Sequence, residues 1–279
     1  LIRLGEIFLH EERYPEAIDT YYRLIELENK NINYYEYIAK SYIKLNDYRN
    51  AYKFYDKIIS IDSNRSEVYF ELGNISLKRD KINDALYYYN EAMECGFESF
   101  DLFYQLGIAY GTITYYDKAI MYFEKARTLN ENNIIDYQIG VAYYKLGLFS
   151  ESSKYLQNYL SDNKEDYLAY YYLGSCFYNL GQYEKAILFF YDSYKINDND
   201  NRVKLLIGLC HKELFEYKDA AKFFKKILKN NPDDAKAQFE LAVCYNKLSK
   251  YREFKKITNS LYMLDRSLHD SLNSFIDNQ

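Results

Sequence analysis

The chain contains 279 residues and carries a formal net charge of −5, with two prolines, ten glycines, no tryptophan and 36 tyrosines. So few turn-forming residues exclude a strand-rich fold and favour a chain that is almost entirely helical. The small net charge points to no particular class of partner. The charge is unevenly distributed, because residues 202–256 contain 14 Lys and Arg but only 7 Asp and Glu.

One pattern of about 34 residues recurs along the chain. In residues 167–200, apolar residues spaced three or four apart predict a first helix, Gly181 and Gln182 predict a turn, and a second helix follows. A small residue marks each first helix at Gly5, Ala39, Gly73, Gly107, Gly140, Gly174, Gly208 and Ala242. Another marks the second helices at Ala17, Ala51, Ala85, Ala119, Ser152, Ala186 and Ala220. Two series with one period predict tandem helical hairpins.

A 34-residue helix–turn–helix unit with this spacing resembles the tetratricopeptide repeat (TPR). One unit carries the family pattern as Phe103, Leu106, Gly107, Tyr110, Ala119, Phe123 and Ala126. The resemblance covers residues 1–266 as about eight units, the first one truncated, and it implies an all-α, right-handed superhelical solenoid. We expect residues 267–279 to form a capping helix, because a terminal repeat has no neighbour on its outer face. The interval from Gly107 to Gly140 is one residue short, which predicts a tightened loop near residues 130–133.

The sequence offers little that could support catalysis or metal binding. His10, His211 and His269 lie far apart in the chain, and His211 occupies a slot that holds an aromatic residue in other units, so we expect it to be a packing residue. No zinc-protease, phosphate-loop, dinucleotide or nucleophile-elbow motif is present. We therefore predict no enzymatic activity, no catalytic or metal-binding residue, no cofactor and no small-molecule substrate.

Targeting signals and cysteines bear on the compartment. No apolar run reaches the roughly 18 residues that a membrane span requires, and no signal peptide is present. Because the chain begins at Leu1 within a helical pattern, we expect it to be a fragment of a longer protein. Cys95, Cys176, Cys210 and Cys244 are interpreted as small buried residues, since equivalent places in stacked repeats are too far apart for disulfides. Free thiols favour a reducing compartment, and we expect the cytoplasm.

The resemblance implies that the first helices line a concave groove and that the second helices face outward. After the small residue of each first helix, the early units carry polar residues and the later ones mostly aliphatic residues. The predicted groove residues are Tyr104, Ile108, Tyr137, Val141, Tyr144, Tyr171, Ser175, Tyr178, Leu205, Leu209, Phe239 and Val243. The flanking polar residues expected to orient a ligand are Lys40, Asn74, Gln105, Gln138 and Asn246. An alternative is that the apolar residues are half-buried against neighbouring helices.

These residues predict a non-catalytic scaffold for protein–protein interaction, which holds a peptide or helix of a partner protein in the groove. A second hypothesis is a targeting or structural module of a larger protein whose catalytic or membrane part lies outside this chain. A third is weak nucleic-acid binding by the basic C-terminal repeats, which the overall acidity disfavours. The basic residues of this third hypothesis are Lys222, Lys225, Lys226, Lys229, Lys250, Arg252, Lys255 and Lys256. The clamp that some TPR proteins use for acidic C-termini is not predicted, because only Lys40 and Asn74 match part of it.

Overall fold

The structure is a computed structural model that describes residues 1–130 and 133–277. All regular secondary structure in these residues is α-helical, which confirms the predicted all-α class. Residues 131 and 132, in the loop predicted to be tightened, lie outside the described residues, as do residues 278 and 279 at the end of the predicted capping helix.

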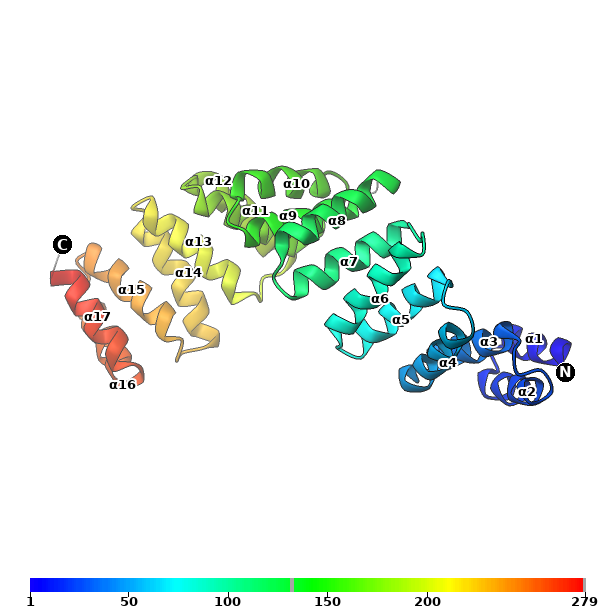
Figure 1. Ribbon diagram of the computed structural model, residues 1–279. Helices are drawn as coiled ribbons and strands as arrows, with labels where there is room; N and C mark the ends of the chain where they lie inside the picture. The colour runs from blue at the N-terminus through cyan, green and yellow to red at the C-terminus, as the bar shows by residue number, and fades with distance from the viewer. Residues whose placement is uncertain (131–132, 278–279) are drawn as a thin grey trace. The chain divides into compact units, whose positions relative to one another are not determined.

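The chain divides into two compact units, Leu1–Ile135 and Asp136–Gln279. The helices of the first unit run from blue to green in Figure 1. They are α1 (Ile2–His10), α2 (Tyr14–Leu27), α3 (Ile32–Lys44), α4 (Tyr48–Ile61), α5 (Ser66–Lys78), α6 (Ile82–Glu94), α7 (Phe100–Thr112) and α8 (Tyr116–Leu129). Each odd-numbered helix packs against the even-numbered helix that follows it, as the repeat pattern predicts.

The second unit continues the same arrangement from green to red in Figure 1. Its helices are α9 (Ile134–Lys145), α10 (Phe149–Asp162), α11 (Tyr167–Asn179), α12 (Tyr183–Ile196), α13 (Asn201–Glu213), α14 (Tyr217–Asn230), α15 (Ala235–Lys247), α16 (Tyr251–Leu264) and α17 (Arg266–Asp277). The boundary between the two units falls in the first turn of α9. Each unit is therefore a stack of helix–turn–helix repeats, which is the predicted solenoid architecture.

The turn inside each repeat is built on one residue with a left-handed backbone. These residues recur at the repeat period as Glu12, Asn46, Asp80, Thr114, Gly147, Gly181, Phe215 and Ser249. The next amide donates to the carbonyl five residues earlier, as from Gln182 to Phe177 at 2.8 Å and from Glu216 to His211 at 2.8 Å. This hydrogen bond closes the first helix and directs the chain into the second. Gly181 adopts its φ of 71° without a side chain to strain, so it ends the helix as the sequence predicts.

The core of each repeat places a large side chain over the small residue of the first helix. A Cβ atom added to Gly174 would lie 2.7 Å from a ring carbon of Phe190, and one added to Gly107 would lie 2.4 Å from Phe123. The partner is always the residue sixteen positions later, in the pairs Gly5–Tyr21, Gly73–Tyr89, Gly107–Phe123, Gly140–Leu156, Gly174–Phe190 and Gly208–Phe224. The glycines are therefore required because an aromatic ring, or Leu156 in the case of Gly140, occupies the space of their missing side chain.

The cysteine prediction is confirmed at three positions and wrong at one. Cys176, Cys210 and Cys244 are buried free thiols inside their repeats. Burial raises the pKa of the Cys176 thiol to about 11 and those of Cys210 and Cys244 to about 12. Cys95 is exposed, because it follows the last residue of α6 rather than lying within a first helix.

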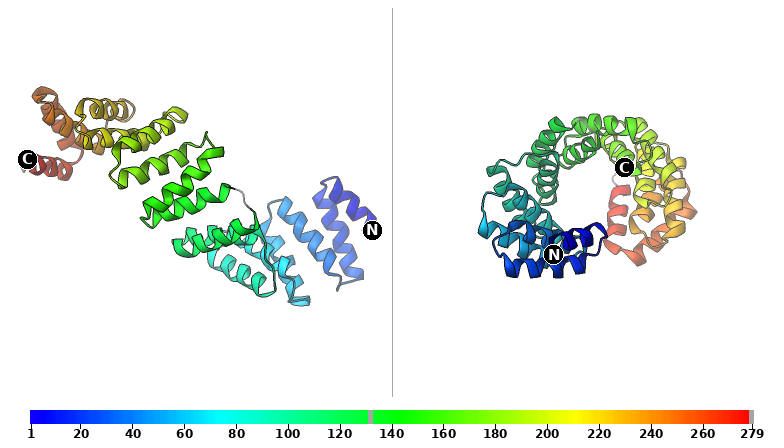
Figure 2. Two further views of the ribbon diagram at one scale, coloured as in Figure 1. Left: turned by 90° about the horizontal axis from the view of Figure 1, so that it is seen from above. Right: turned by 90° about the vertical axis from the view of Figure 1, so that its right-hand side faces the viewer.

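His211 has the packing role that its position in the repeat predicts. Its ring stacks on Phe223 with centroids 6.1 Å apart, and its Nδ1 lies 2.6 Å from Oε2 of Glu216. At the C-terminal end of the stack, α17 packs against α15 and α16, and Figure 2 shows the same neighbours from two further directions. Leu272 of α17 is fully buried in a cluster with Leu261 and Val243.

Candidate partner-binding surface

Some first helices of consecutive repeats touch one another within each unit. In the first unit α5 contacts α7, and in the second α11 contacts α13 and α13 contacts α15. The odd-numbered helices are the layer on which the predicted partner-binding residues lie.

In the first unit, the predicted residues are already engaged with their neighbours. Lys40 is exposed, and its Nζ lies 2.6 Å from Oε1 of Glu36. Asn74 is half-buried, and its Oδ1 accepts a hydrogen bond of 2.9 Å from the Tyr89 hydroxyl. The predicted residues on α7 are Tyr104, Gln105 and Ile108, and all three are half-buried. The Tyr104 ring stacks on Phe100, with centroids 5.9 Å apart.

In the second unit, α9 and α11 bring four tyrosines together. We call Tyr137, Tyr144, Tyr171 and Tyr172 the tyrosine cluster; all four are half-buried. The ring of Tyr172 lies 6.4 Å from Tyr137, 5.3 Å from Tyr144 and 5.4 Å from Tyr171, measured between centroids. The contacts are edge-to-face, the arrangement that aromatic rings prefer. Sequence analysis predicted three of these residues and missed Tyr172, which joins them.

The hydroxyl groups of Tyr137, Tyr144 and Tyr171 remain protonated around neutral pH. Burial is the main cause that raises the pKa values of Tyr137, Tyr144 and Tyr171. The guanidinium group of Arg202 lies 5.2 Å from the centroid of the Tyr171 ring. Arg202 is itself held by Asp200, with Nη2 and Oδ2 2.6 Å apart. The cluster thus presents neutral hydrogen-bond donors with a cation at one edge, and the sequence pattern had not identified Arg202.

Three predicted surface residues are buried. Ser175, Leu209 and Val243 are 2%, 9% and 4% exposed. All three follow the small residue of a first helix, where packing of the repeats covers the side chain. Ser175 also donates a hydrogen bond of 2.7 Å to the Tyr171 carbonyl of its own helix. These residues lie beneath the first-helix surface. Their burial agrees with the alternative that such residues pack against neighbouring helices.

The remaining predicted residues of the second unit are half-buried. They are Gln138, Val141, Tyr178, Leu205, Phe239 and Asn246. Burial raises the pKa of Tyr178 to about 12, and its ring meets Tyr183 edge-to-face with centroids 5.5 Å apart. Leu205 packs on the cluster around Phe224, and Phe239 packs on the cluster around Leu272. Their exposed edges extend the first-helix surface beyond the tyrosine cluster.

Most of the basic residues named for nucleic-acid binding lie on second helices. Lys222, Lys225 and Lys226 are exposed on α14. Lys222 pairs with Asp219 at 2.7 Å, and Lys226 covers the ring of Phe223 at 4.6 Å from its centroid. These contacts are those of a solvated helix face whose lysine stems cover aromatic rings.

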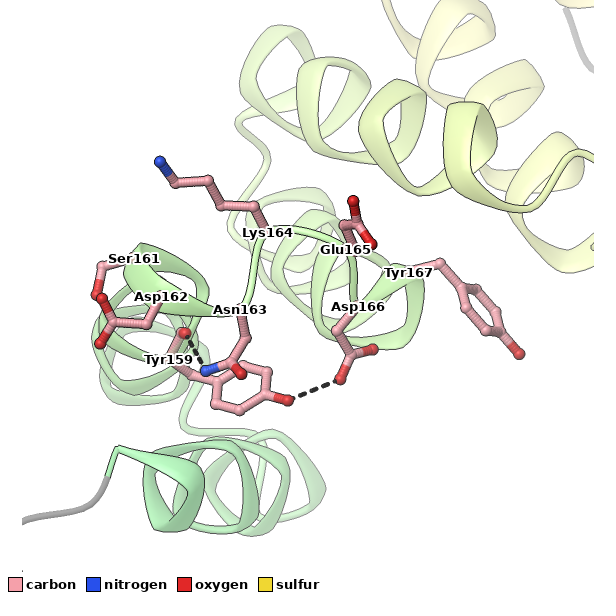
Figure 3. Close-up of a pocket in the computed structure, with 8 residues that line it drawn as sticks. All are labelled: Tyr159, Ser161, Asp162, Asn163, Lys164, Glu165, Asp166 and Tyr167. Atoms are coloured by element: carbon pink, nitrogen blue, oxygen red, sulfur yellow. Dashed lines mark hydrogen bonds between the residues drawn. The ribbon is translucent and has the colours of Figure 1, made fainter.

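Figure 3 shows a pocket of about 870 Å³ in the second unit, where α10 turns into α11. Its lining residues are Tyr159, Ser161, Asp162, Asn163, Lys164, Glu165, Asp166 and Tyr167. The Tyr159 hydroxyl donates to Asp166 at 3.0 Å, and Lys164 points away from both residues in the picture. Asp166 also accepts hydrogen bonds from the amides of Leu168 and Ala169, which start α11. The Asp166 carboxylate in this pocket therefore serves the loop itself.

A second pocket, of about 520 Å³, lies in the first unit between α3 and α5. It is lined by Glu36, Lys40, Tyr55, Arg65, Glu67, Val68 and Glu71. Sequence analysis had identified only Lys40 among these residues. Within the described ranges 1–130 and 133–277, no group of three or more His, Cys, Asp or Glu side chains could hold a metal ion. No helix in those ranges is long and apolar enough to cross a membrane.

The chain belongs to the tetratricopeptide repeat family. One family model described as tetratricopeptide repeat matches residues 137–201 and 213–253. A second model with the same description matches residues 32–65 and 100–133. The matches fall in both units and confirm the resemblance drawn from the spacing of small and aromatic residues.

Solved structures, two of them described as TPR proteins, share the fold. YrrB, described as a TPR protein with an unusual peptide-binding site, is 23% identical, with a TM-score of 0.62 over 67% of this chain and 97% of that one. MamA is 21% identical, with a TM-score of 0.57 over 61% of this chain and 93% of that one. The C-terminal part of a TPR repeat-containing protein from Cytophaga hutchinsonii is 18% identical, with a TM-score of 0.60 over 96% of both chains. No curated protein sequence gives a significant match.

Proposed function

We propose that this chain is a non-catalytic scaffold for protein–protein interaction, which binds a peptide or helix of a partner along its first helices. The observation that supports this function best is the tyrosine cluster. Two consecutive first helices of the second unit present four half-buried rings that contact one another. Tyrosine is enriched at protein interfaces because one residue offers a large apolar ring and a hydrogen-bonding hydroxyl.

The packing of the cluster favours binding in a second way. The rings of Tyr144 and Tyr171 are both held against Tyr172, so they lose little rotamer freedom when a partner docks. Ordering of side chains is one of the main costs of association, and a surface ordered in advance avoids it. The likeness to YrrB, described as having a peptide-binding site, agrees with this proposal.

The proposal includes a compartment. Three buried cysteines recur at the repeat period without forming disulfides. Proteins of oxidising compartments commonly use cysteines as cross-links, whereas reduced thiols are usual in the cytosol. We therefore place the scaffold in the cytoplasm.

The function is tested by selecting peptides from a displayed library of random 12-residue sequences on the immobilised chain. Affinities of the selected peptides are then compared for the wild type and the Tyr144→Ser, Tyr171→Ser double variant. Loss of two aromatic anchors should weaken binding by at least about 2 kcal/mol, which is roughly thirtyfold in Kd. Circular dichroism checks that the variant keeps its helicity.

The matched control is Tyr251→Ser, which removes a tyrosine that is 69% exposed on the second helix α16. Its affinity for the same peptides should equal that of the wild type. The proposal is wrong if the control loses binding while the tyrosine-cluster variant retains it, because the binding surface would then lie on the second helices.

A further inference from the structure

We propose that the pocket between α3 and α5 binds a lysine or arginine side chain of the partner peptide, through Glu71 and the hydroxyl group of Tyr55. The inference rests on the proposed function, since it assigns part of a partner to the first-helix surface. The inference predicts that the partner carries a cationic side chain, whereas the tyrosine cluster does not define the chemical class of the partner residue.

The two cations that line the pocket are already paired with a carboxylate within it. Glu36 binds Lys40 through Oε1 at 2.6 Å and Arg65 through Oε2 at 3.2 Å. An incoming anion would have to displace Glu36 from both cations. Glu36, Lys40 and Arg65 together carry a net charge of +1, and the carboxylates of Glu67 and Glu71 add two negative charges, so the lining has a net charge of −1 and favours a cation.

Glu71 is the carboxylate best placed to receive that cation. No Lys, Arg or His side chain of the described residues lies within ion-pair distance of it. Burial raises the pKa of the Glu71 carboxyl, an effect that hydrogen bonding to Asn74 and the charge of Lys40 only partly oppose. A partly buried carboxylate without a counterion destabilises the protein, and a ligand cation beside it would remove that penalty.

Tyr55 supplies an independent observation. Its side chain is 1% exposed, it lines the pocket, and its hydroxyl has no hydrogen-bond partner in the part of the chain that the structure describes. A buried polar group left without a partner costs about 1–3 kcal/mol. An ammonium or guanidinium group has several N–H donors, so it can bond the phenol oxygen and the Glu71 carboxylate together.

Comparison with other repeats shows that this hydroxyl is not needed for packing. The equivalent residue of the next repeat is Tyr89, whose hydroxyl donates to Asn74 at 2.9 Å. Later repeats have Phe123, Phe190 or Phe224 in the same place. Tyr21 of the first repeat also lacks a partner for its hydroxyl, but Tyr55 is the one that lines this pocket. At the position equivalent to Glu71, the next repeat has the uncharged Gln105.

The test uses blocked amino acids as probes: the N-acetyl, C-methylamide forms of lysine, arginine and norleucine. Norleucine has an aliphatic side chain without the ammonium group. Titration of the isotope-labelled full chain, followed by NMR, should show saturable shifts for lysine or arginine at residues of α3 and α5, and none for norleucine. Glu71→Gln should weaken the binding of the cationic probes by at least about tenfold, since charge-assisted hydrogen bonds are worth about 1.5–3 kcal/mol.

Tyr55→Phe should weaken binding of the cationic probes about threefold, because it removes one hydrogen bond and keeps the ring. Tyr89→Phe is the matched control: it removes the same atom one repeat later and should leave probe binding unchanged. Urea unfolding separates binding from folding, because Glu71→Gln should keep or raise the free energy of unfolding.

The proposal would be overturned if blocked norleucine bound as tightly as the cationic probes, or if Glu71→Gln bound the cationic probes as tightly as the wild type. So would tighter binding of blocked glutamate, which would assign the pocket to anions through Lys40 and Arg65. The double variant of Tyr144 and Tyr171 should still bind the cationic probes. If this double variant binds both the cationic probes and the selected peptides as the wild type does, the proposed function fails and the cation pocket stands. If the wild type binds no cationic probe, and the double variant loses its affinity for the selected peptides, the cation pocket fails and the proposed function stands.

Discussion

Gly107 and Gly111 lie one turn apart on α7, and an added methyl group would meet different surroundings at each. At Gly107 it would lie 2.4 Å from the Phe123 ring, whereas at Gly111 its nearest neighbour is the Ala119 Cβ at 3.8 Å. We expect Gly107→Ala to lower the free energy of unfolding by about 1–3 kcal/mol through overpacking, despite the better helix propensity of alanine. Gly111→Ala should instead raise it by up to about 1 kcal/mol.

Urea unfolding of the two variants, followed by circular dichroism, measures both changes. Equal effects of the two substitutions would show that the ring of Phe123 moves aside at little cost, and that the glycines of the first helices are not required by packing.

The four thiols should differ sharply in reactivity toward a thiol reagent. Cys95 is exposed, whereas Cys176, Cys210 and Cys244 are buried and have raised pKa values. Because the thiolate is the reactive form, we expect one fast-reacting group per native chain at pH 8 and four in urea. Mass spectrometry after brief labelling should locate the label at Cys95. Rapid labelling of Cys210 in the native chain would contradict the packing of the second unit.

At the scale of the helix, we propose that α17 acts as a cap for the last repeat. Its Leu272 is fully buried against Leu261, Ala242 and Val243. Leu272→Asp should lower the free energy of unfolding of the C-terminal repeats by about 3 kcal/mol, because it removes apolar contacts and buries a charge. Ser271→Asp adds the same charge at the exposed neighbouring position and should have little effect.

Hydrogen exchange of α15 and α16 measures the consequence for the repeat that α17 covers. Faster exchange in both helices is expected for Leu272→Asp alone. Unchanged exchange would mean that the last repeat is stable without α17.

The sequence predicted the helices better than it predicted the surface, and the reason is physical. Helix positions follow from the local spacing of apolar and small residues in the sequence. Gly174 was therefore assigned correctly to a first helix and Gly181 to the turn that follows it. Whether a first-helix residue is exposed depends on how closely the next repeat approaches, which periodicity does not encode. Ser175 and Leu209 are therefore buried although their positions suggested a surface.

The pocket between α3 and α5 escaped prediction for a related reason. Its lining combines residues from two first helices, one second helix and the loop before α5. Tyr55 reads in the sequence as one more aromatic core residue, and only the structure shows that its hydroxyl lacks a partner. The sequence feature that could have indicated this pocket is a tyrosine at a repeat position where later repeats have phenylalanine.

At the scale of the whole molecule, a repeat protein is stabilised by the sum of its repeats and the interfaces between neighbours. Phe190 is fully buried in the second unit, so Phe190→Ala should destabilise its surroundings by about 3–5 kcal/mol. We expect hydrogen exchange to accelerate most in α11 and α12, less in α10 and α13, and least in α3 and α4. Mass spectrometry of peptides from each helix gives this profile. A uniform acceleration along both units would show that the chain unfolds as one cooperative body.

The constant offset between each first-helix glycine and its covering side chain also makes the length of the chain adjustable. Every such pair is sixteen residues apart and so lies within a single repeat. Removing or duplicating one complete period leaves each pair intact and joins equivalent interfaces, whereas an insertion or deletion of another length between the two members of a pair separates that glycine from the side chain that covers it. Recombination within the coding sequence can therefore produce longer or shorter versions of this scaffold in one step, and each version inherits or loses a whole segment of partner-facing surface.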